Sequence, residues 1–399
     1  MAYDVEALRA HFPALRDGVA YFDGPGGTQT PREVGEAVAA TLTGPLSNRG
    51  LTSASQRNAD RAVVEFREAY GDLLGVPPTG VVHGRSATQL TYDLSRAIAK
   101  TWRAGDEVVV SRLDHDCNVR PWVQAAQAAG ATVRWIDFEP GTGEVDLDSA
   151  RAAITGRTRV VAVTAASNLI GTEPPVRAIA DLAHAAGALL YVDAVHYAAH
   201  SFVDVAGLGA DLLVCSPYKL LGPHCGVLAA APGLLETLWP DKLAPATDAV
   251  PERFEHGTLP YEILAGATAA VDFLAGIAPG AGQTRRDRLR NSLEAVEEHE
   301  RRLLGELDAG LAGMATNHSR AAERTPTLLL TLPGRRTWDA FQFLARRDVL
   351  APAGSFYAFE PFRRLALDDE HGLRLGLAPY TNDDDVARVV DGLREFLRG

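Results

Sequence analysis

The sequence of 399 residues predicts an α/β fold built on a mostly parallel sheet. Short runs of Val, Leu and Ala alternate with longer segments of helical periodicity from about residue 60 to residue 230. These runs are apolar at nearly every position and end in small or polar residues, as strands do when helices cover both faces of their sheet. With 46% hydrophobic residues, the chain is long enough for one large domain and a smaller one.

The first part of the chain supplies the large sheet and its helices. Helices are predicted where apolar residues recur every three or four positions, and strands where a short apolar run meets turn residues. These rules predict, in chain order, a helix over 60–74, a strand over 80–83, a helix over 87–100, a strand over 108–110, a helix over 121–129, strands over 132–136 and 160–163, a helix over 175–186, and strands over 188–192 and 212–215.

The pattern changes after Gly226. A strand is predicted at 227–230, and no regular structure is assigned to 239–260. A long charged helix (285–307) then leads to a strand (327–332), a helix (338–346), a strand (373–377) and a helix (382–397), which starts with a capping Asn382 and three acidic residues. We therefore expect an N-terminal segment (1–20) that packs near the small domain, a large domain (21–260), and a linker helix with a small α+β domain (261–399).

Charge and composition limit the classes of partner. The formal net charge of −12, from 39 basic and 51 acidic residues, argues against nucleic acid and anionic membranes. No apolar run reaches the roughly 18 residues that a membrane span requires, and the first residues lack the pattern of a signal peptide. Three scattered cysteines suit a reducing compartment and lack the spacing of a zinc site. We expect a cytoplasmic protein without a metal site.

Two of the predicted strands end in residues of complementary chemistry. The run 188–192 is followed by Asp193, and the run 212–215 is followed by Ser216 and, three residues later, by Lys219. Parallel sheets carry their functional residues at the carboxyl ends of their strands. Pyridoxal 5′-phosphate (PLP) needs a lysine amine for its aldehyde and a carboxylate that keeps its pyridine nitrogen protonated. Each residue alone has another interpretation, a helix cap for Asp193 and a solvated side chain for Lys219.

The phosphate of such a cofactor has candidate partners as well. Ser86, Ala87 and Thr88 open a predicted helix, whose free N–H groups and positive dipole end suit a phosphate, although plain helix capping is an equal alternative. Ser216 and Tyr218 offer hydroxyl groups beside Lys219.

Four more residues are candidates for binding the ring and the substrate. His115 follows the strand at 108–110, where its imidazole would stack on the pyridine ring and shuttle protons, or have only a structural role. Asn168 and His196 also follow strands and would reach the phenolic oxygen of the cofactor or the substrate. Arg374 lies in a predicted strand, where its planar guanidinium would bind an α-carboxylate or form a surface ion pair.

Seven short motifs follow one another along the chain: YFDGPGGTQ (21–29), LDHDCN (113–118), ASNLIGT (166–172), VDAVH (192–196), SPYK (216–219), HGTLP (256–260) and RLGL (374–377). In these motifs and their order, the chain resembles the class V aminotransferase family of PLP fold type I, most closely its cysteine desulfurase-like group. The resemblance implies a large domain with a mostly parallel, seven-stranded-type sheet, a small C-terminal α+β domain, and PLP as the cofactor.

The resemblance also implies roles for the residues around the ring. Lys219 would form the Schiff base, Asp193 would hold the pyridine nitrogen, and His115 would stack on the ring. His196 stands where the family usually has a glutamine that bonds the phenolic oxygen, and it keeps a hydrogen-bond donor there.

The phosphate contacts implied by the resemblance involve two subunits. Thr88, Ser216 and Tyr218 would bind the phosphate, with Tyr218 at a position where desulfurases often have histidine. Thr258 would reach the phosphate of the neighbouring subunit, which implies a homodimer with shared active sites.

One departure from the family concerns sulfur chemistry. Cysteine desulfurases carry a mobile cysteine that takes sulfur from the substrate, and the corresponding stretch here, 349–358, contains none. Ser355 cannot replace it, because a hydroxyl lacks the acidity and the sulfur chemistry of a thiolate. Cys117 and Cys225 are expected to be small buried core residues instead.

The leading hypothesis is therefore a PLP-dependent lyase that cleaves the C–S bond of cysteine or an S-substituted amino acid without a persulfide. Asn168 and Arg374 would orient the carboxylate of this small substrate, and Lys219 would remove its α-proton. A class V aminotransferase or an epimerase acting on another amino acid is the alternative. A catalytically inert binding protein on the same fold is a third interpretation, against which the presence of both Lys219 and Asp193 speaks.

Overall fold

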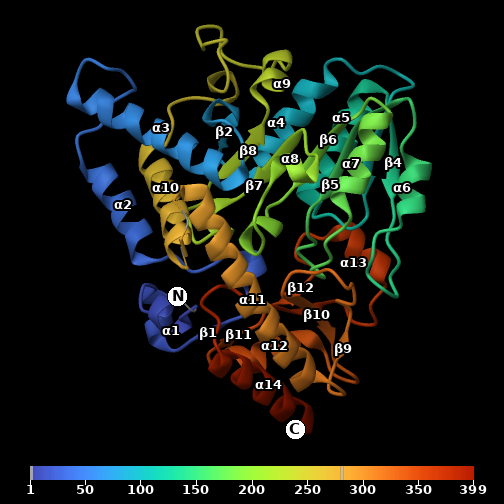
Figure 1. Cartoon of the computed structure of the whole chain (residues 1–399). Coiled ribbons are helices and arrows are strands. Elements are labelled where there is room, and N and C mark those ends of the chain that lie inside the picture. The colour runs from blue at the N-terminus through green and yellow to red at the C-terminus, as the bar shows by residue number, and fades with distance from the viewer. Residues whose placement is uncertain (1–2, 279, 282) are drawn as a thin grey trace.

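The computed structural model describes residues 3–278, 280, 281 and 283–399; Met1 and Ala2, the start of the predicted N-terminal segment, lie outside these residues. The largest sheet has seven strands (Figure 1). Across the sheet they are β2 (Val81–Gly84), β8 (Gly226–Ala230), β7 (Leu212–Cys215), β6 (Leu189–Asp193), β5 (Thr158–Thr164), β3 (Glu107–Ser111) and β4 (Thr132–Ile136). Only the pairs that involve β8 are antiparallel, which confirms the predicted α/β class with a mostly parallel sheet.

Helices cover both faces of this sheet. One face packs against α3 (Ala54–Leu74), α6 (Leu147–Ala153), α7 (Val176–Ala185), α8 (Val205–Leu208) and α10 (Tyr261–Gly276), and the other against α4 (Ala87–Ala99), α5 (Arg120–Ala129) and α9 (Pro232–Thr237). Alternate strand residues face the two layers. Val161 and Val163 of β5 lie in the first core and Val160 and Ala162 in the second, so the middle of the strand is apolar on both faces. α2 (Arg32–Thr43) packs against α10.

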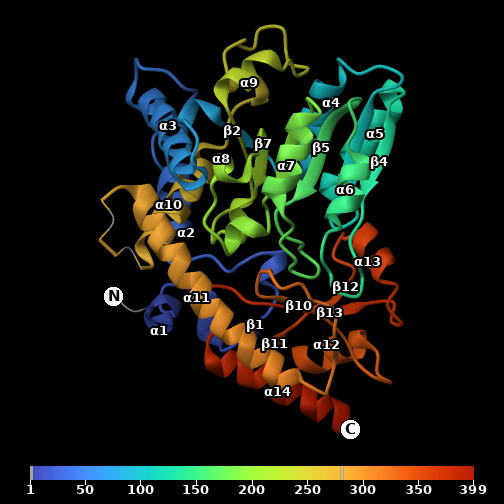
Figure 2. The ribbon, with the colours of Figure 1, turned by 45° about the vertical axis from the view of Figure 1, so that its right-hand side comes forward.

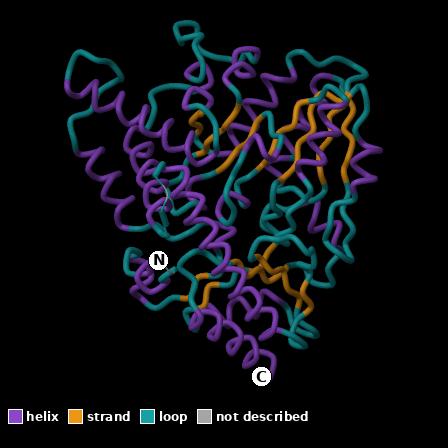
Figure 3. Tube along the Cα trace, in the orientation of Figure 1, coloured by secondary structure: helices purple, strands orange, loops and turns teal. Residues whose placement is uncertain are grey.

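A second, smaller sheet lies in the other half of the molecule, and Figure 3 shows the two groups of strands apart. It is antiparallel and consists, in order, of β12 (Ala353–Gly354), β13 (Gly372–Gly376), β10 (Thr327–Thr331) and β9 (Thr316–Asn317). Its core includes residues of α11 (Arg285–Leu311), α12 (Thr337–Ala345) and α14 (Asp383–Arg398), and α13 (Phe359–Leu365) lies between β12 and β13 in the chain. The long α11 runs from α10 to α14 and so joins the two halves (Figure 2).

The N-terminal part of the chain contacts its C-terminal part. After α1 (Val5–Arg9), β1 (Ala20–Tyr21) pairs in parallel with β11 (Val349–Leu350). The predicted boundaries of the N-terminal segment, the large domain and the small domain stay a prediction.

The predicted strands and helices are present, with ends that differ by a few residues. The largest shift is at α3, which begins at Ala54 because Ser53 and Gln56 form a capping box there. Among the helices that were not predicted are α2, α6, α10 and α13. Within the described residues, no helix is both long and apolar enough to cross a membrane.

Candidate active site

The strand ends that were predicted to carry the chemistry meet at one cavity. Its lining consists of Ser86, Ala87, Thr88, His115, Cys117, Thr164, Ala166, Asn168, Asp193, Val195, His196, Ser216, Tyr218 and Lys219. Every predicted site residue except Thr258 and Arg374 therefore borders this cavity. The side chains come from the carboxyl ends of β5, β6 and β7, from the turn after β3, and from the start of α4.

Lys219 and Asp193 are the charged groups of this cavity, and both are buried. Lys219 ends a single 3-10 turn, Pro217–Lys219, that follows β7. Burial, together with the charge of Arg374, lowers the pKa of its amine to about 8, although Asp193 acts in the opposite direction. Burial raises the pKa of Asp193, while the N–H of Val195, 2.9 Å from Oδ1, and the charge of Lys219 oppose this shift. The amine is therefore neutral far more often at pH 7 than an exposed lysine.

His115 and Cys117 lie on the short turn after β3. Nδ1 of His115 accepts a hydrogen bond from the backbone N–H of Cys117 (3.1 Å), which leaves the proton of the neutral ring on Nε2. Burial and the charge of Lys219 lower the pKa of His115 to about 4, so the ring is neutral at pH 7. The Cys117 thiol donates to Oδ2 of Asp193 (3.4 Å). The expectation that Cys117 only fills the core is wrong, because its side chain forms part of the cavity wall.

The first turn of α4 borders the same cavity. Oγ of Ser86 caps the helix by accepting the N–H of Gln89 (3.1 Å), and Ala87 and Thr88 begin the helix beside the cavity. Gly226 of β8 permits this close approach, since a Cβ at that position would lie 2.4 Å from the carbonyl carbon of Ser86. The helix therefore presents free N–H groups and the positive end of its dipole to the cavity.

Ser216 and Tyr218 belong to the turn that carries Lys219. The Tyr218 ring stacks on His224, with centroids 4.9 Å apart and planes 7° apart. The backbone carbonyl of Tyr218 accepts the N–H of Thr28 (3.0 Å), which fixes the glycine-rich motif at 21–29 against this turn. The same packing leaves little space at Gly27, where a Cβ would lie 3.2 Å from the Tyr218 ring.

His196 connects the cavity with the smaller sheet. Its Nε2 lies 2.9 Å from Oγ1 of Thr325 and 3.0 Å from Oγ1 of Thr327. Its other ring nitrogen, Nδ1, is buried without a hydrogen-bond partner within the described part of the chain. His196 also contacts the ring of His200, whose Nδ1 pairs with the buried Glu300 of α11 (2.8 Å).

Arg374 is buried behind the cavity and is not part of its lining. Its Nη1 donates to the backbone carbonyl of Asn168 (2.9 Å), and its guanidinium carbon lies 3.8 Å from the centroid of the Phe356 ring. The side-chain amide of Asn168 donates to the carbonyl of Phe356 (3.0 Å). The alternative of a surface ion pair for Arg374 is thus wrong, because the side chain is only 3% exposed.

Ten of the fourteen residues of the cavity wall were candidates from the sequence, and four were missed. Thr164, Ala166, Val195 and Cys117 were not among the candidates. Thr164 ends β5 just as Asp193 ends β6, so the strand-end rule applies to it as well. Thr258, in contrast, is exposed in the single chain, and its role at a neighbouring subunit stays a prediction.

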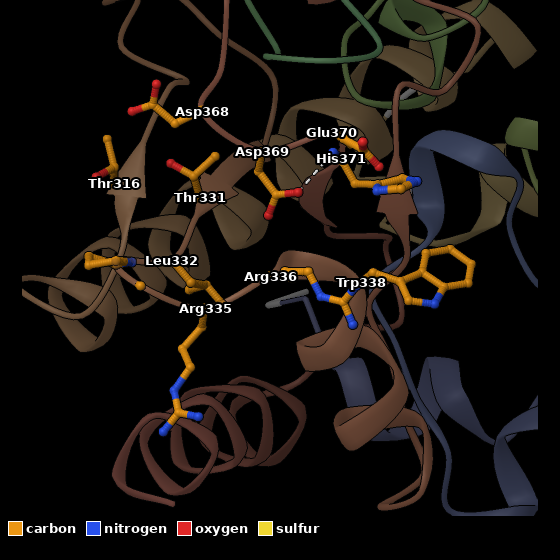
Figure 4. A pocket seen from close by; sticks show the side chains of 12 residues that line it. Thr316, Thr331, Leu332, Arg335, Arg336, Trp338, Asp368, Asp369, Glu370 and His371 are labelled. Atoms are coloured by element: carbon orange, nitrogen blue, oxygen red, sulfur yellow. Dashed lines mark hydrogen bonds between the residues drawn. The ribbon is translucent and has the colours of Figure 1, made fainter.

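A larger hollow lies elsewhere, on the surface of the small sheet (Figure 4). Its labelled side chains include the acidic Asp368, Asp369 and Glu370 and the basic Arg335 and Arg336. None of the predicted site residues lines it. We therefore place the candidate active site at the cavity around Lys219.

Buried polar atoms without partners test whether the cavity suits PLP. Nδ1 of His196 and Oδ1 of Asn168, two residues of the cavity lining, and Nε of the adjacent Arg374 are buried and make no hydrogen bond within the described residues. Such atoms cost free energy unless a bound molecule satisfies them, so they indicate a polar ligand. A buried amine, a buried carboxylate and a helix N-terminus in the same place are the groups that PLP needs. The residues fit this cofactor.

Comparison with known proteins points to one family. The model of the family described as Aminotransferase class-V matches residues 20–389. An uncharacterized protein of Mycobacterium tuberculosis is 29% identical over 98% of this chain and 99% of its own length. A probable cysteine desulfurase of Mycobacterium leprae is 29% identical over 99% of this chain and 97% of its own length.

The solved structures agree with the sequence matches. The cysteine desulfurase CsdA of Escherichia coli superposes with a TM-score of 0.88, is 26% identical, and aligns over 100% of this chain and 99% of its own. The likeness therefore extends over both halves of the molecule and includes the segments that carry the site.

Proposed function

Because this chain belongs to the class-V aminotransferase family of PLP-dependent enzymes, we propose that it is a lyase that cleaves the C–S bond of cysteine or an S-substituted cysteine. We further propose that no persulfide forms on the protein. The relatives named as cysteine desulfurases support the substrate class. The absence of a persulfide is supported by the positions of Cys215 and Cys225 outside the cavity and by the raised pKa of the Cys117 thiol, which keeps it protonated.

The proposed roles follow from the positions of the side chains. PLP, when bound, supplies a ring that accepts the electron pair released at the substrate's α-carbon. Lys219 would hold the cofactor and, once freed by the substrate amine, accept the α-proton, which a pKa of about 8 allows near neutral pH. Asp193 would pair with the ring nitrogen and His115 would lie on the ring. Arg374 and Asn168 would bind the substrate carboxylate.

The observation that carries the proposal is the segment next to Arg374. Phe356 covers the guanidinium of Arg374 and accepts a hydrogen bond from Asn168, and the stretch 349–358 has no cysteine. Cys215 and Cys225 are buried in the core under the large sheet, and burial raises the pKa of Cys225 to about 12. A thiol of this kind is a poor sulfur acceptor, because the thiolate is the reactive form.

The direct test is product analysis with S-substituted cysteines. The C–S bond breaks, the sulfur leaves as a thiol with one proton, and water converts the remaining three-carbon unit to pyruvate and ammonium. We expect thiol, pyruvate and ammonium in equal amounts, and none from Lys219→Ala. After turnover with cysteine, mass spectrometry should find no added sulfur on Cys117, Cys215 or Cys225.

Other outcomes would contradict the proposal in distinct ways. A persulfide on any of the three cysteines would overturn the second part of the proposal alone. Absence of pyruvate across a broad panel of substrates would overturn the lyase. Turnover that requires an added keto acid would identify an aminotransferase instead.

We also propose a homodimer with shared active sites. Thr258 is exposed in the single chain and lies on the stretch 239–260, which also exposes Trp239 (51%) and Leu243 (72%). A partner chain that binds along this stretch would cover both apolar side chains. The three unpaired cysteines are in keeping with the further proposal of a cytoplasmic location.

A further inference from the structure

A thiol that was expected only to fill the core touches the carboxylate proposed to hold the ring nitrogen of the cofactor. Sγ of Cys117 lies 3.4 Å from Oδ2 of Asp193 and donates to it. The other carboxylate oxygen, Oδ1, accepts the N–H of Val195 at 2.9 Å. Each oxygen of Asp193 therefore has a protein donor, and each keeps lone-pair capacity for one more partner.

The turn that carries Cys117 is braced from several sides. Its backbone N–H donates to Nδ1 of His115 (3.1 Å). The next residue, Asn118, donates to Oδ1 of Asp114 (2.6 Å) and accepts the indole N–H of Trp122 (3.2 Å). Cys117 thus connects His115 through its backbone and Asp193 through its thiol, and a substitution of the side chain removes only the second link.

The surroundings of the thiol decide which chemistry is open to it. Burial and the neighbouring charge of Asp193 raise the pKa of Cys117 well above its usual value. The side chain therefore stays protonated, since its loss of a proton would set two negative charges beside each other. A neutral thiol is a weak nucleophile but remains a hydrogen-bond donor.

We propose that Cys117 is a positioning residue for the cofactor, whose S–H keeps the Asp193 carboxylate ionised and oriented toward the ring nitrogen. The inference rests on the proposed role of Asp193. A donor on Oδ2 stabilises the carboxylate relative to the carboxylic acid, and the carboxylate in turn keeps a paired ring nitrogen protonated. The donor also limits rotation of the carboxyl group, so that the second oxygen stays on the backbone N–H of Val195.

Two substitutions of similar size separate a hydrogen bond from packing. Cys117→Ala removes the donor, and Cys117→Ser keeps one. For the alanine variant we expect the affinity of the cofactor-free protein for PLP to fall about three- to tenfold, and the visible absorption band of the bound cofactor to shift. The serine variant should keep the affinity within about twofold and leave the band in place. The matched control is Cys225→Ala, whose buried thiol lies outside the cavity and whose loss should move neither quantity.

The outcomes distinguish a failure of the role of Cys117 from a failure of the proposed function on which it rests. Equal defects in the alanine and serine variants, or no change in the alanine variant, would overturn the role of the thiol. If the alanine variant does not fold, Cys117→Val fills the space without a donor, and its comparison with Cys117→Ser decides in the same way.

Asp193→Asn provides the remaining comparison. If this substitution leaves the affinity and the band unchanged, the proposed role of Asp193 fails, and the inference about Cys117 fails with it. If it changes both and Cys117→Ala changes neither, only the inference about Cys117 is overturned. In the Asp193→Asn background, we expect Cys117→Ala to cause no further shift of the band.

Discussion

The amine of Lys219 illustrates how single residues obtain their chemistry here. Burial is the largest cause of its lowered pKa, and burial is also the largest cause for His115, Asp193 and Arg374. Burial makes the cationic groups lose protons more easily and the carboxylate hold its proton more tightly. The cavity therefore favours neutral forms, and a bound cofactor with charged groups supplies the counter-charges that the side chains lack.

Uptake of PLP by the cofactor-free protein should therefore depend on pH. Covalent attachment needs the neutral amine, and at pH 7 roughly a tenth of a population with a pKa of about 8 is neutral, against roughly one in three thousand for an ordinary lysine. Because the folded pKa is lowered to about 8, the rate should reach half of its maximum near pH 8 and level off above about pH 9. Absorbance changes after mixing, recorded between about pH 6 and pH 10, measure this rate.

Two results would complete or contradict that expectation. Lys219→Ala, reduced with borohydride after mixing, should show no covalent cofactor in mass spectra. A rate in the wild-type protein that keeps rising to about pH 10 would mean that the amine titrates like an exposed lysine.

The sequence predicted most single residues of the site because they obey a simple rule. Asp193 closes its strand and Lys219 follows one turn after another strand, so their positions depend on local pattern; the overlooked Thr164 fits the same rule. Cys117 and His196 depend instead on partners far along the chain. The thiol bonds a residue 76 positions away, and the imidazole bonds Thr325, 129 positions away. No periodicity in the sequence encodes such contacts.

At the scale of elements, the contact between β8 and α4 positions the start of the helix. Gly226 begins β8 and touches the backbone of Ser86 and Ala87, where the helix turns its free N–H groups to the cavity. A side chain in this place would have to displace backbone rather than a flexible neighbour. The glycine thus links the edge of the sheet to the proposed phosphate site.

Gly226→Ala should therefore weaken both the fold and the binding of PLP. The added Cβ would lie 2.4 Å from the carbonyl carbon of Ser86, so the first turn of α4 must move and its N–H groups lose their alignment. We expect at least about a tenfold loss of PLP affinity. Urea unfolding and titration with PLP measure the two effects.

A glycine in open space gives the matched control. Gly35 lies on the exposed side of α2, and a Cβ there would meet nothing within 4 Å. Gly35→Ala should leave PLP affinity unchanged and raise the stability by about 0.5–1 kcal/mol, because alanine favours a helix. Equal PLP affinity in Gly226→Ala and the wild-type protein would show that the contact does not position α4.

Two physical causes account for three of the helices that the sequence failed to predict. α10 is apolar on nearly all sides, because it packs against α2, α3 and α11 at once, so it has no polar face to produce a period. α13 and α6 have only seven residues each, too few for a clear pattern. The strands were predictable because helices cover both faces of the large sheet. Most of its strands are therefore short continuous apolar runs.

At the scale of the whole molecule, the site depends on both sheets. The smaller sheet contributes Arg374 from β13 and Thr327 from β10, which contact Asn168 and His196 at the edge of the large sheet. α11 joins the same two halves and adds Glu300 beneath His200. The site therefore requires the correct packing of the two sheets against each other, and we propose that the neighbouring subunit is a third contributor.

Complementation between two inactive variants tests whether a partner chain completes the site. Lys219→Ala cannot attach PLP covalently, and Thr258→Asp would set a negative charge beside the phosphate of the neighbouring chain. Thr258 is exposed, so the aspartate should not disturb the fold of its own chain. If the sites are shared, a mixed dimer has one site with both defects and one intact site. Random pairing then gives mixed dimers in half of the population, and about a quarter of the wild-type covalent cofactor.

If each active site is formed by one chain alone, we expect no complementation, because each chain keeps its own defect in any mixture. Co-expressed variants would then contain no more covalent cofactor than the Thr258→Asp chain contributes alone. The control pairs Lys219→Ala with Thr258→Ser instead of Thr258→Asp. The serine keeps the hydroxyl, so this pair controls for the co-expression of two different chains. Size-exclusion chromatography with light scattering shows whether dimers are present at all. A strictly monomeric protein with full cofactor content would exclude the shared site, and Thr258 would then be an ordinary surface residue.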